Sequence, residues 1–419
     1  MPFTAKQECY LHANHIAHRH HGGTRGAFFA VYDINGKFKL LGRGTFGLVV
    51  TPPIACPEGD PRARRTNGRV GKLFFDEASA DIELQRALLV QNTIDQRHQF
   101  TTTAIQHVCH VKKVDDELWE EVATDKHVLD KLQAVLDLKK AVPQIISEKV
   151  AGHSWHRLRG IPLKRFLGML SNAAQALYVF AKHGFQHCDV TPRNLMWDEK
   201  EGVKLIDYGM TTIGSDVLRM YCMTDYQYFP PEFAFLGSLR TVWRRKEAVE
   251  PDEEKKAAIL ARQEVDIADL AEAIKAALKR YISSIKWTRV DGDDTLKADL
   301  LAAHECWSQF ATLAYRTQVD TGTAYKDLLL PYVGKTDVYQ LGVCVYEMVF
   351  NNDAIAFKDD NERAELLKLA KIMAFPTPGP RDTIVALIDR IADTQERLFG
   401  KRSPIQIQGP PAKKSKRVS

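Results

Sequence analysis

Two carboxylates and an amide lie close together near the middle of the chain, between short apolar stretches. Asp189 and Asn194 are five residues apart in the segment His-Cys-Asp-Val-Thr-Pro-Arg-Asn, and Asp207 follows in Ile-Asp-Tyr-Gly. Carboxylate and amide oxygens are ligands that hard cations such as Mg²⁺ prefer, and a carboxylate can also accept a proton. These side chains therefore predict a site that binds a divalent cation and accepts a proton.

A lysine nearer the amino terminus is a candidate partner for an anion. Lys72 is centred in the apolar segment Val-Gly-Lys-Leu-Phe, where burial is costly unless a negative charge meets the ammonium group. We expect Glu83, on a helix predicted over 76–93, to form that ion pair. Glu77 on the same helix is the alternative partner. The glutamate that does not pair with Lys72 would be an ordinary solvated residue.

A glycine-rich string, Gly42-x-Gly44-x-x-Gly47, allows three interpretations. A dinucleotide-binding loop must lead directly into a helix, whereas this string leads into the extended run Leu-Val-Val-Thr-Pro-Pro. A Walker P-loop would need Gly at 66 and Ser or Thr at 73, and the chain has Thr66 and Leu73. We therefore expect a turn between two strands whose backbone N–H groups can approach phosphates.

The order of these motifs resembles that of the eukaryotic-type protein kinase superfamily. The glycine-rich turn and the strand lysine are followed by His-x-Asp-x₄-Asn, Asp-x-Gly, a Pro-Pro-Glu segment ending at Glu232, and the segment Asp337-Val-Tyr-Gln-Leu-Gly. The resemblance covers about residues 38–350 apart from an insertion. The early section is most similar to divergent kinases of large cytoplasmic DNA viruses.

This resemblance implies roles for the residues introduced above. ATP and Mg²⁺ would be the cofactors, with Mn²⁺ as an alternative metal, and a protein hydroxyl would be the acceptor. Asp189 would accept the hydroxyl proton, Lys72 would hold the α- and β-phosphates, and Asn194 and Asp207 would bind the metal. Asp337 would brace the catalytic loop from the helix that follows.

Residues 145–152 resemble the hinge that contacts adenine. Backbone groups of Glu148 and Val150 would meet the base, and Ser147 would occupy the gatekeeper position. A register shifted by one residue would place Ile146 there instead. The nucleotide-binding residues that the resemblance implies are Gly42, Gly44, Thr45, Phe46, Gly47, Val49, Lys72, Glu83, Ser147, Glu148 and Val150.

Several positions depart from the usual kinase pattern. Cys188 replaces the arginine that usually precedes the catalytic aspartate, so the chain is of the non-RD type. Thr191 replaces a lysine common in serine/threonine kinases, and Arg193 could supply the missing charge, so we include both in the catalytic set. About ninety residues are inserted between Glu232 and Asp337, where the family normally has about a dozen.

The implied architecture is an α+β, two-lobed protein kinase fold with a small antiparallel β-sheet lobe and a larger helical lobe. The sequence also predicts a helix over 163–182 and short strands over 185–187, 195–197 and 203–206. The predicted organisation is a flexible His-rich segment over 1–27, an N-lobe over 28–150, a C-lobe over 151–400 with a helical insertion over 237–333, and a basic disordered tail over 401–419.

Composition limits the class of protein. The 419 residues are 45% hydrophobic and 26% charged, which is typical of a globular chain. No apolar run approaches the ~18 residues of a membrane helix, so we expect no membrane association. The N-terminus lacks a secretory signal, and the seven cysteines contain no Cys-x-x-Cys pair. We therefore expect free thiols and an intracellular location.

The formal net charge of +5 falls to +1 without the four cations of the tail, Lys413, Lys414, Lys416 and Arg417. A nearly neutral body argues against specific nucleic-acid binding. The basic cluster resembles a nuclear import signal, so an import receptor is an expected partner and the location is cytoplasmic, nuclear or both. The alternative is a tail that only improves solubility or binds nucleic acid without specificity.

The sequence therefore favours an active Mg-ATP-dependent protein kinase, with Ser/Thr preferred over Tyr. One alternative is a pseudokinase or ATP-binding scaffold that acts through its helical insertion. A small-molecule kinase of related fold is a further alternative, although the Pro-Pro-Glu segment is typical of an activation segment for protein substrates.

Overall fold

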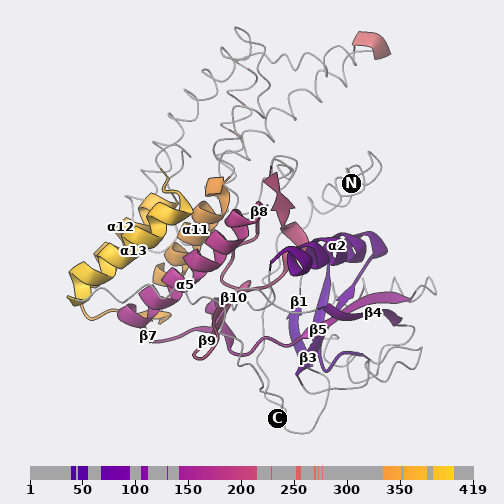
Figure 1. Ribbon diagram of the computed structural model, residues 1–419, viewed down its shortest axis with the longest axis horizontal. Helices are drawn as coiled ribbons and strands as arrows, with labels where there is room; N and C mark the ends of the chain where they lie inside the picture. Colours follow the sequence, from indigo (N-terminus) through magenta and orange to yellow (C-terminus); the bar gives the residue numbers. More distant parts are fainter. Residues whose placement is uncertain are drawn as a thin grey trace, which may run out of the picture. The chain divides into compact units, whose positions relative to one another are not determined.

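The computed structural model of the protein describes residues 39–43, 46–54, 68–94, 105–111, 141–214, 334–350, 353–374 and 381–400, together with positions 130, 228, 252–255, 269, 272 and 276. These residues form a mixed α and β structure with a small antiparallel sheet and several helices, which is compatible with the α+β class expected from the sequence (Figure 1). The expected His-rich segment 1–27, Gly44, Thr45, Glu232, most of the insertion 237–333 and the tail 401–419 lie outside the described residues.

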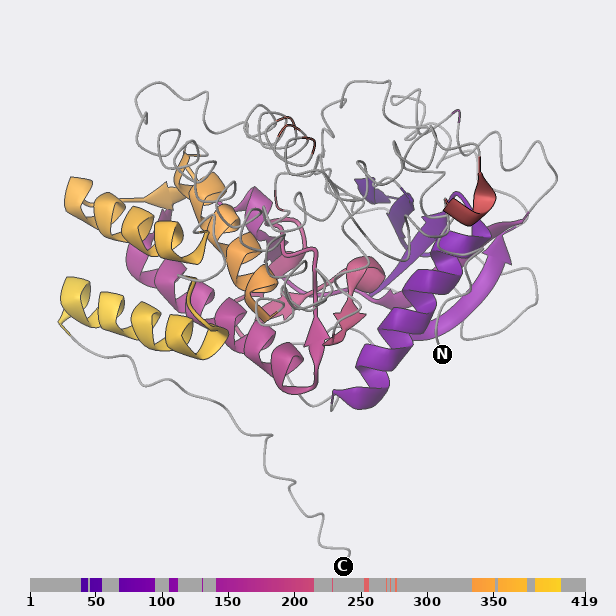
Figure 2. The same ribbon diagram turned by 90° about the horizontal axis from the view of Figure 1, so that it is seen from above.

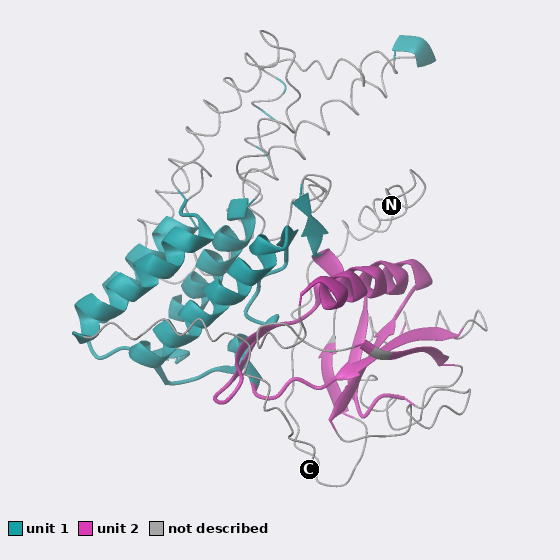
Figure 3. Ribbon diagram, in the orientation of Figure 1, with its two compact units in different colours: residues 1–20, 153–195, 211–407 teal, residues 21–152, 196–210, 408–419 magenta. Residues whose placement is uncertain are grey.

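The chain divides into two compact units (Figure 3). Unit 1 contains residues 1–20, 153–195 and 211–407, and unit 2 contains residues 21–152, 196–210 and 408–419.

Unit 2 is built on a five-stranded antiparallel sheet with the order β1-β2-β3-β5-β4. Its strands are β1 (Lys39–Arg43), β2 (Gly47–Thr51), β3 (Arg69–Phe74), β4 (Ile105–Val111) and β5 (Val142–Glu148). Burial of apolar strand residues such as Leu48, Leu73 and Ile146 stabilises the sheet.

The turn between β1 and β2 requires glycine at its second end. Gly47 lies opposite Phe74 on β3, and a Cβ at this position would lie only 1.9 Å from the carbonyl oxygen of Leu73. Any larger residue would push the two strands apart. Glycine is therefore required here by the close packing of the two strands, whether or not a ligand binds.

Helix α2 (Glu77–Thr93) packs beside the strands of this sheet, as Figure 2 shows. Asp76 caps its N-terminus, because one carboxylate oxygen accepts a hydrogen bond from the N–H of Ser79 at 2.8 Å. Ala80 joins the buried cluster formed by Phe74 and Ile145. The cap and this contact fix the rotation of the helix and thereby the direction of its polar face.

The described part of unit 1 is mainly helical. Helix α5 (Leu163–Lys182) packs against α13 (Ile384–Phe399), and α11 (Thr336–Phe350) packs against α12 (Asp360–Met373), as Figures 1 and 2 show. Helix α11 is buried along nearly its whole length. Its Gly342 permits the close approach of the end of α12, since a Cβ there would lie 2.6 Å from the backbone nitrogen of Ala374.

Short elements complete the two units. In unit 1, β8 (Phe185–Gln186) pairs with β11 (Thr212–Ile213), and β7 (Ile161–Pro162) pairs with β12 (Ile355–Ala356). The remaining elements are β6 (His153–Ser154), η3 (Trp155–Arg157), β9 (Leu195–Asp198), β10 (Gly202–Leu205) and η4 (Tyr208–Met210). The helices predicted over 76–93 and 163–182, and the three short strands, are confirmed to within about a residue.

The expectation of free thiols is wrong for Cys109. Cys188 and Cys344 are buried thiols outside any disulfide, whereas Cys109 on β4 is disulfide-bonded. Spacing along the chain does not reveal a pair that only the fold brings together. Among the described helices, none is both long and apolar enough to cross a membrane.

Candidate active site

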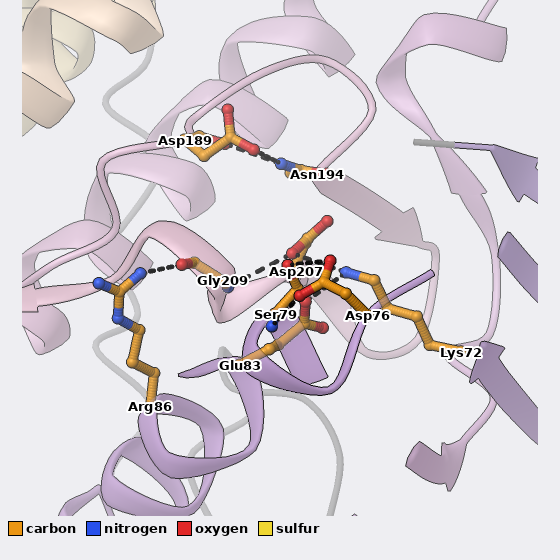
Figure 4. A network of polar contacts seen from close by, with 9 residues as sticks. All are labelled: Lys72, Asp76, Ser79, Glu83, Arg86, Asp189, Asn194, Asp207 and Gly209. Carbon is orange, nitrogen blue, oxygen red and sulfur yellow. Dashed lines mark hydrogen bonds and ion pairs between the residues drawn. The ribbon is translucent and has the colours of Figure 1, made fainter. Parts of the chain in front are cut away.

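A lysine in unit 2 lies between two carboxylates. The Nζ of Lys72 on β3 is 2.6 Å from Oε2 of Glu83 and 3.1 Å from Oδ1 of Asp207 (Figure 4). The lysine and glutamate side chains are only 20% and 14% exposed, whereas that of Asp207 is 39% exposed. The ammonium group therefore joins α2 to the Asp-Tyr-Gly turn through one buried ion pair and one more exposed pair.

Burial and charge oppose each other in this cluster. Burial alone would lower the pKa of Lys72, but the charges of Asp207 and Glu83 and the hydrogen bonds to them outweigh it, so the pKa lies above its ordinary value. Burial raises the pKa of Glu83 to about 7, although the charge of Lys72 opposes this shift. Lys72 therefore keeps its positive charge.

The structure selects between the two glutamates on α2. Glu83 faces the sheet side of the helix and contacts Lys72, whereas Glu77 is exposed and its carboxylate lies 2.9 Å from Nε2 of His110. The six-residue separation does not place both glutamates on one face of a helix with 3.6 residues per turn. The pairing expected from the sequence is thus the one that the structure contains.

The Asp-Tyr-Gly turn is held by α2 as well as by its own backbone. Asp207 has a positive φ of 65°, a conformation that aspartate tolerates better than most residues. The N–H of Gly209 donates to Oδ1 of Asp207 at 3.3 Å, and the guanidinium group of Arg86 donates to the carbonyl oxygen of Gly209 (Figure 4). Arg86 was not predicted from the sequence, although it follows Glu83 by three residues and so shares its side of the helix.

The strand register places several of the expected nucleotide-binding residues on one face of the sheet. Lys72 lies opposite Val49 on β2 and opposite Ile145 on β5. Directly paired residues point to the same face, and residues two apart along a strand do so too. Ser147 therefore shares the face of Lys72 and Val49.

The neighbouring expected positions lie as follows. Ile146 points to the opposite face, where it is fully buried and packs against Cys109. Phe46 packs against the buried cluster that contains Phe74. Glu148 ends β5 and is exposed, and Val150 is half-buried two residues later. The register of the sheet therefore favours Ser147 over Ile146 on the side of the lysine.

In unit 1, Asp189 and Asn194 hydrogen-bond to each other across a tight loop. The Nδ2 of Asn194 donates to Oδ2 of Asp189 at 2.7 Å and to the carbonyl oxygen of Asp189 at 2.9 Å (Figure 4). The carbonyl oxygen of Thr191 accepts the N–H of Asn194 at 3.0 Å, and the Thr191 side chain is buried. Arg193 is exposed.

An acidic side chain of helix α11 supports this loop. The two carboxylate oxygens of Asp337 accept hydrogen bonds from the N–H groups of His187 and Cys188, at 2.8 and 2.9 Å. Burial raises the pKa of Asp337 to about 6, and these two hydrogen bonds oppose the shift. Asp337 thus braces the loop in the way the motif predicts, and it does so as a buried carboxylate.

Two further side chains of α11 contact the same loop and were missed from the sequence. Gln340 hydrogen-bonds to backbone groups of Cys188 and Val190, and the Sγ of Cys344 donates to the carbonyl oxygen of Val190 at 3.3 Å. The spacing of Gln340 and Cys344, three and seven residues after Asp337, was the available signal, because it defines one face of a helix.

The donor atoms suit a hard cation. In unit 1 the amide nitrogen of Asn194 donates to Asp189, and in unit 2 the carboxylate of Asp207 is 39% exposed. Oxygen ligands of this kind fit Mg²⁺ or Mn²⁺ rather than zinc. Within each unit, the described residues contain no cluster of three or more His, Cys, Asp and Glu side chains that could hold a metal unaided.

Comparison with known proteins gives a short similarity. A stretch of 57 residues, 14% of this chain, is 37% identical to the serine/threonine-protein kinase VHS1 of Saccharomyces cerevisiae. The chain spans 12% of the length of that kinase. No family model matches the chain. A kinase-like region is therefore indicated.

Proposed function

We propose that the protein is a Mg-ATP-dependent protein kinase with the two-lobed kinase fold, and that it transfers the γ-phosphoryl group to Ser or Thr hydroxyls. The observation that carries the proposal is the position of the Lys72 ammonium group between Glu83 and Asp207. A lysine held in this way is a fixed positive charge for phosphate oxygens, beside a carboxylate suited to the metal. The short similarity to a yeast serine/threonine kinase supports the same class.

The Lys72–Glu83–Asp207 cluster and the Asp189–Asn194 pair would have different roles in the reaction. In unit 2, Lys72 would bind the α- and β-phosphates and Asp207 would hold the metal, which neutralises charge on the transferred group. In unit 1, Asn194 would supply a second metal ligand and Asp189 would accept the proton of the substrate hydroxyl. Because phosphoryl transfer requires mainly positioning and charge neutralisation, rigid support of these side chains is the main contribution of the chain.

Transfer of ³²P from labelled ATP to generic acceptor proteins, with and without Mg²⁺, tests this proposal. Asp189→Asn should abolish transfer while nucleotide binding persists, and Lys72→Met and Asp207→Ala should each abolish transfer while the melting temperature shows a folded protein. Wild-type rates in any of the three variants would contradict the assignment. A purified protein that binds Mg-ATP but transfers no phosphate would favour the pseudokinase alternative.

The small-molecule kinase alternative is tested with the same label. Incorporation into a pool of sugars, nucleosides and choline-like alcohols, but not into proteins, would favour it. The presence of Pro230-Pro231-Glu232 in the sequence supports a protein acceptor.

A further inference from the structure

The backbone on both sides of Asp189 is hydrogen-bonded to a single side chain of α11. The N–H of Val190 donates to Oε1 of Gln340 at 3.0 Å, and Nε2 of Gln340 donates to the carbonyl oxygen of Cys188 at 2.9 Å. One carboxamide thus bridges the residues before and after Asp189. These contacts lie within unit 1, and the Gln340 side chain is fully buried.

The orientation of the Gln340 carboxamide is determined by its partners. A backbone N–H can only donate and a backbone carbonyl can only accept, so only one of the two amide orientations satisfies both groups. Both groups are buried, and removal of the carboxamide would leave a donor and an acceptor without this partner.

The residue before Asp189 is in an unfavourable conformation. Cys188 has a φ of 61°, in the left-handed region that residues other than glycine rarely adopt. Such a conformation persists only where the surroundings impose it. Asp337 accepts the N–H of Cys188, and Gln340 donates to its carbonyl oxygen, so two side chains of α11 hold this peptide unit from both ends.

We propose that Gln340 is a positioning residue for Asp189, which it keeps in the orientation needed to accept the substrate proton. This inference rests on the proposed kinase function, because it assigns Gln340 a role through the proposed proton acceptor. Loss of the carboxamide should release the loop and displace Asp189. The Lys72–Glu83–Asp207 cluster belongs to unit 2, so nucleotide affinity should change less than the rate of transfer.

The first test compares Gln340→Leu with Gln175→Leu. Gln175 is also a buried glutamine of unit 1, but it hydrogen-bonds to Ser171 within its own helix. Gln340→Leu should lower kcat for transfer to a generic acceptor protein by about 10- to 100-fold and change KM for ATP by less than about threefold. Gln175→Leu should keep kcat within about threefold of wild type.

A second variant separates positioning from simple destabilisation. In Gln340→Glu, the neutral acid can accept from Val190 and donate to Cys188 as the amide does, whereas the carboxylate can only accept. The kcat of this variant relative to wild type should therefore fall as pH rises through the pKa of the introduced acid. Burial raises that pKa above the ordinary value of a glutamate. A role in stability alone predicts no such change in relative kcat for the folded protein.

Each outcome has a defined meaning. If the wild type is active and folded Gln340→Leu has the same kcat, the positioning role is overturned and the proposed function stands. If Gln340→Leu does not fold, a Gln340→Glu variant whose kcat relative to wild type is independent of pH overturns the role. A wild-type protein that binds Mg-ATP but transfers no phosphate overturns both proposals.

Discussion

The Nζ of Lys72 lies 2.6 Å from Oε2 of Glu83, although one residue belongs to a strand and the other to a helix. The pair is formed because Asp76 caps the helix directly after β3 and Ala80 packs onto the sheet. These two contacts direct the next turn of α2, and with it Glu83, toward the lysine. The ion pair is therefore a consequence of local helix geometry as well as of charge attraction.

Glu83→Gln should reduce phosphotransfer by about 10- to 100-fold, because a neutral amide attracts and orients the Lys72 ammonium group less strongly. Glu77→Gln is the matched control, since Glu77 lies on the same helix but is exposed and contacts His110. Initial rates with labelled ATP measure both variants. Equal losses of rate in the two variants would show that phosphotransfer depends on the integrity of α2 rather than on the Lys72–Glu83 ion pair.

Arg86→Met should also lower activity, by about tenfold, because it removes the donor that ties the carbonyl oxygen of Gly209 to α2. Arg86→Lys should recover part of the rate, since a lysine keeps a charged donor on the same helix face. Arg397→Met, at an exposed position on α13, serves as the control. If Arg86→Met has the wild-type rate and affinity for Mg-ATP, this contact does not position the Asp-Tyr-Gly turn.

The sequence predicted elements and motifs better than long-range contacts. The helix over 163–182 was predictable because its apolar residues recur with helical periodicity, and the Lys72–Glu83 pair because a buried lysine needs an anion. Arg86 and Gln340 were missed, because each acts on a backbone group more than a hundred residues away. Each follows a predicted residue, Glu83 or Asp337, by three positions, and that helical spacing was the only signal in the sequence.

Asp337 should make stability depend on pH. Its folded-state pKa is about 6, against an ordinary value of 3.8, because burial favours the protonated form. The stabilisation linked to this proton is fully present below about pH 4 and is lost as pH rises through about 6. At about 1.4 kcal/mol for each tenfold change in proton affinity, the loss in free energy of unfolding is ~3 kcal/mol.

Urea denaturation of wild type and Asp337→Asn between pH 4 and 7 measures this effect. The amide does not titrate and can accept only one of the two N–H bonds, so the variant should be less stable. The stability advantage of wild type should shrink as pH rises from 4 to 6 and then stay constant. A pH-independent difference would show that the carboxylate is stabilised in the folded state by its two N–H donors as fully as in water.

Activity should not require phosphorylation of the segment that follows Asp207. The proposed kinase function would place an arginine directly before Asp189, but this chain has Cys188 there, and its Sγ lies 3.4 Å from Oγ1 of Thr212 in the strand that pairs with β8. A buried thiol cannot bind a phosphate as a guanidinium group does. Protein treated with phosphatase should keep its rate of phosphotransfer, and a large loss that a kinase restores would show that another cation binds the phosphate.

Ser147 should allow bulky inhibitors that compete with ATP. Ser147 pairs with Val70, which lies two residues before Lys72 on β3, so Ser147 and Lys72 point to the same face of the sheet. Ile146 is buried on the other face. The kinase resemblance places the gatekeeper here, where most members carry a larger side chain. At a gatekeeper position, a small hydroxymethyl group should leave space for an aromatic substituent on a purine analogue.

Burying one aromatic ring contributes about 1.5–3 kcal/mol, which corresponds to roughly one to two orders of magnitude in affinity at about 1.4 kcal/mol for each tenfold change. The phenyl ring of Ser147→Phe should fill that space and lower the affinity for the bulky analogue by this factor. ATP should still bind, because it carries no group that extends there. Competition of the analogue and of ATP against a fluorescent nucleotide measures both affinities in the two proteins. Equal affinity of the analogue for wild type and Ser147→Phe would place the gatekeeper at another residue. Ser147 would then only hydrogen-bond to a backbone group.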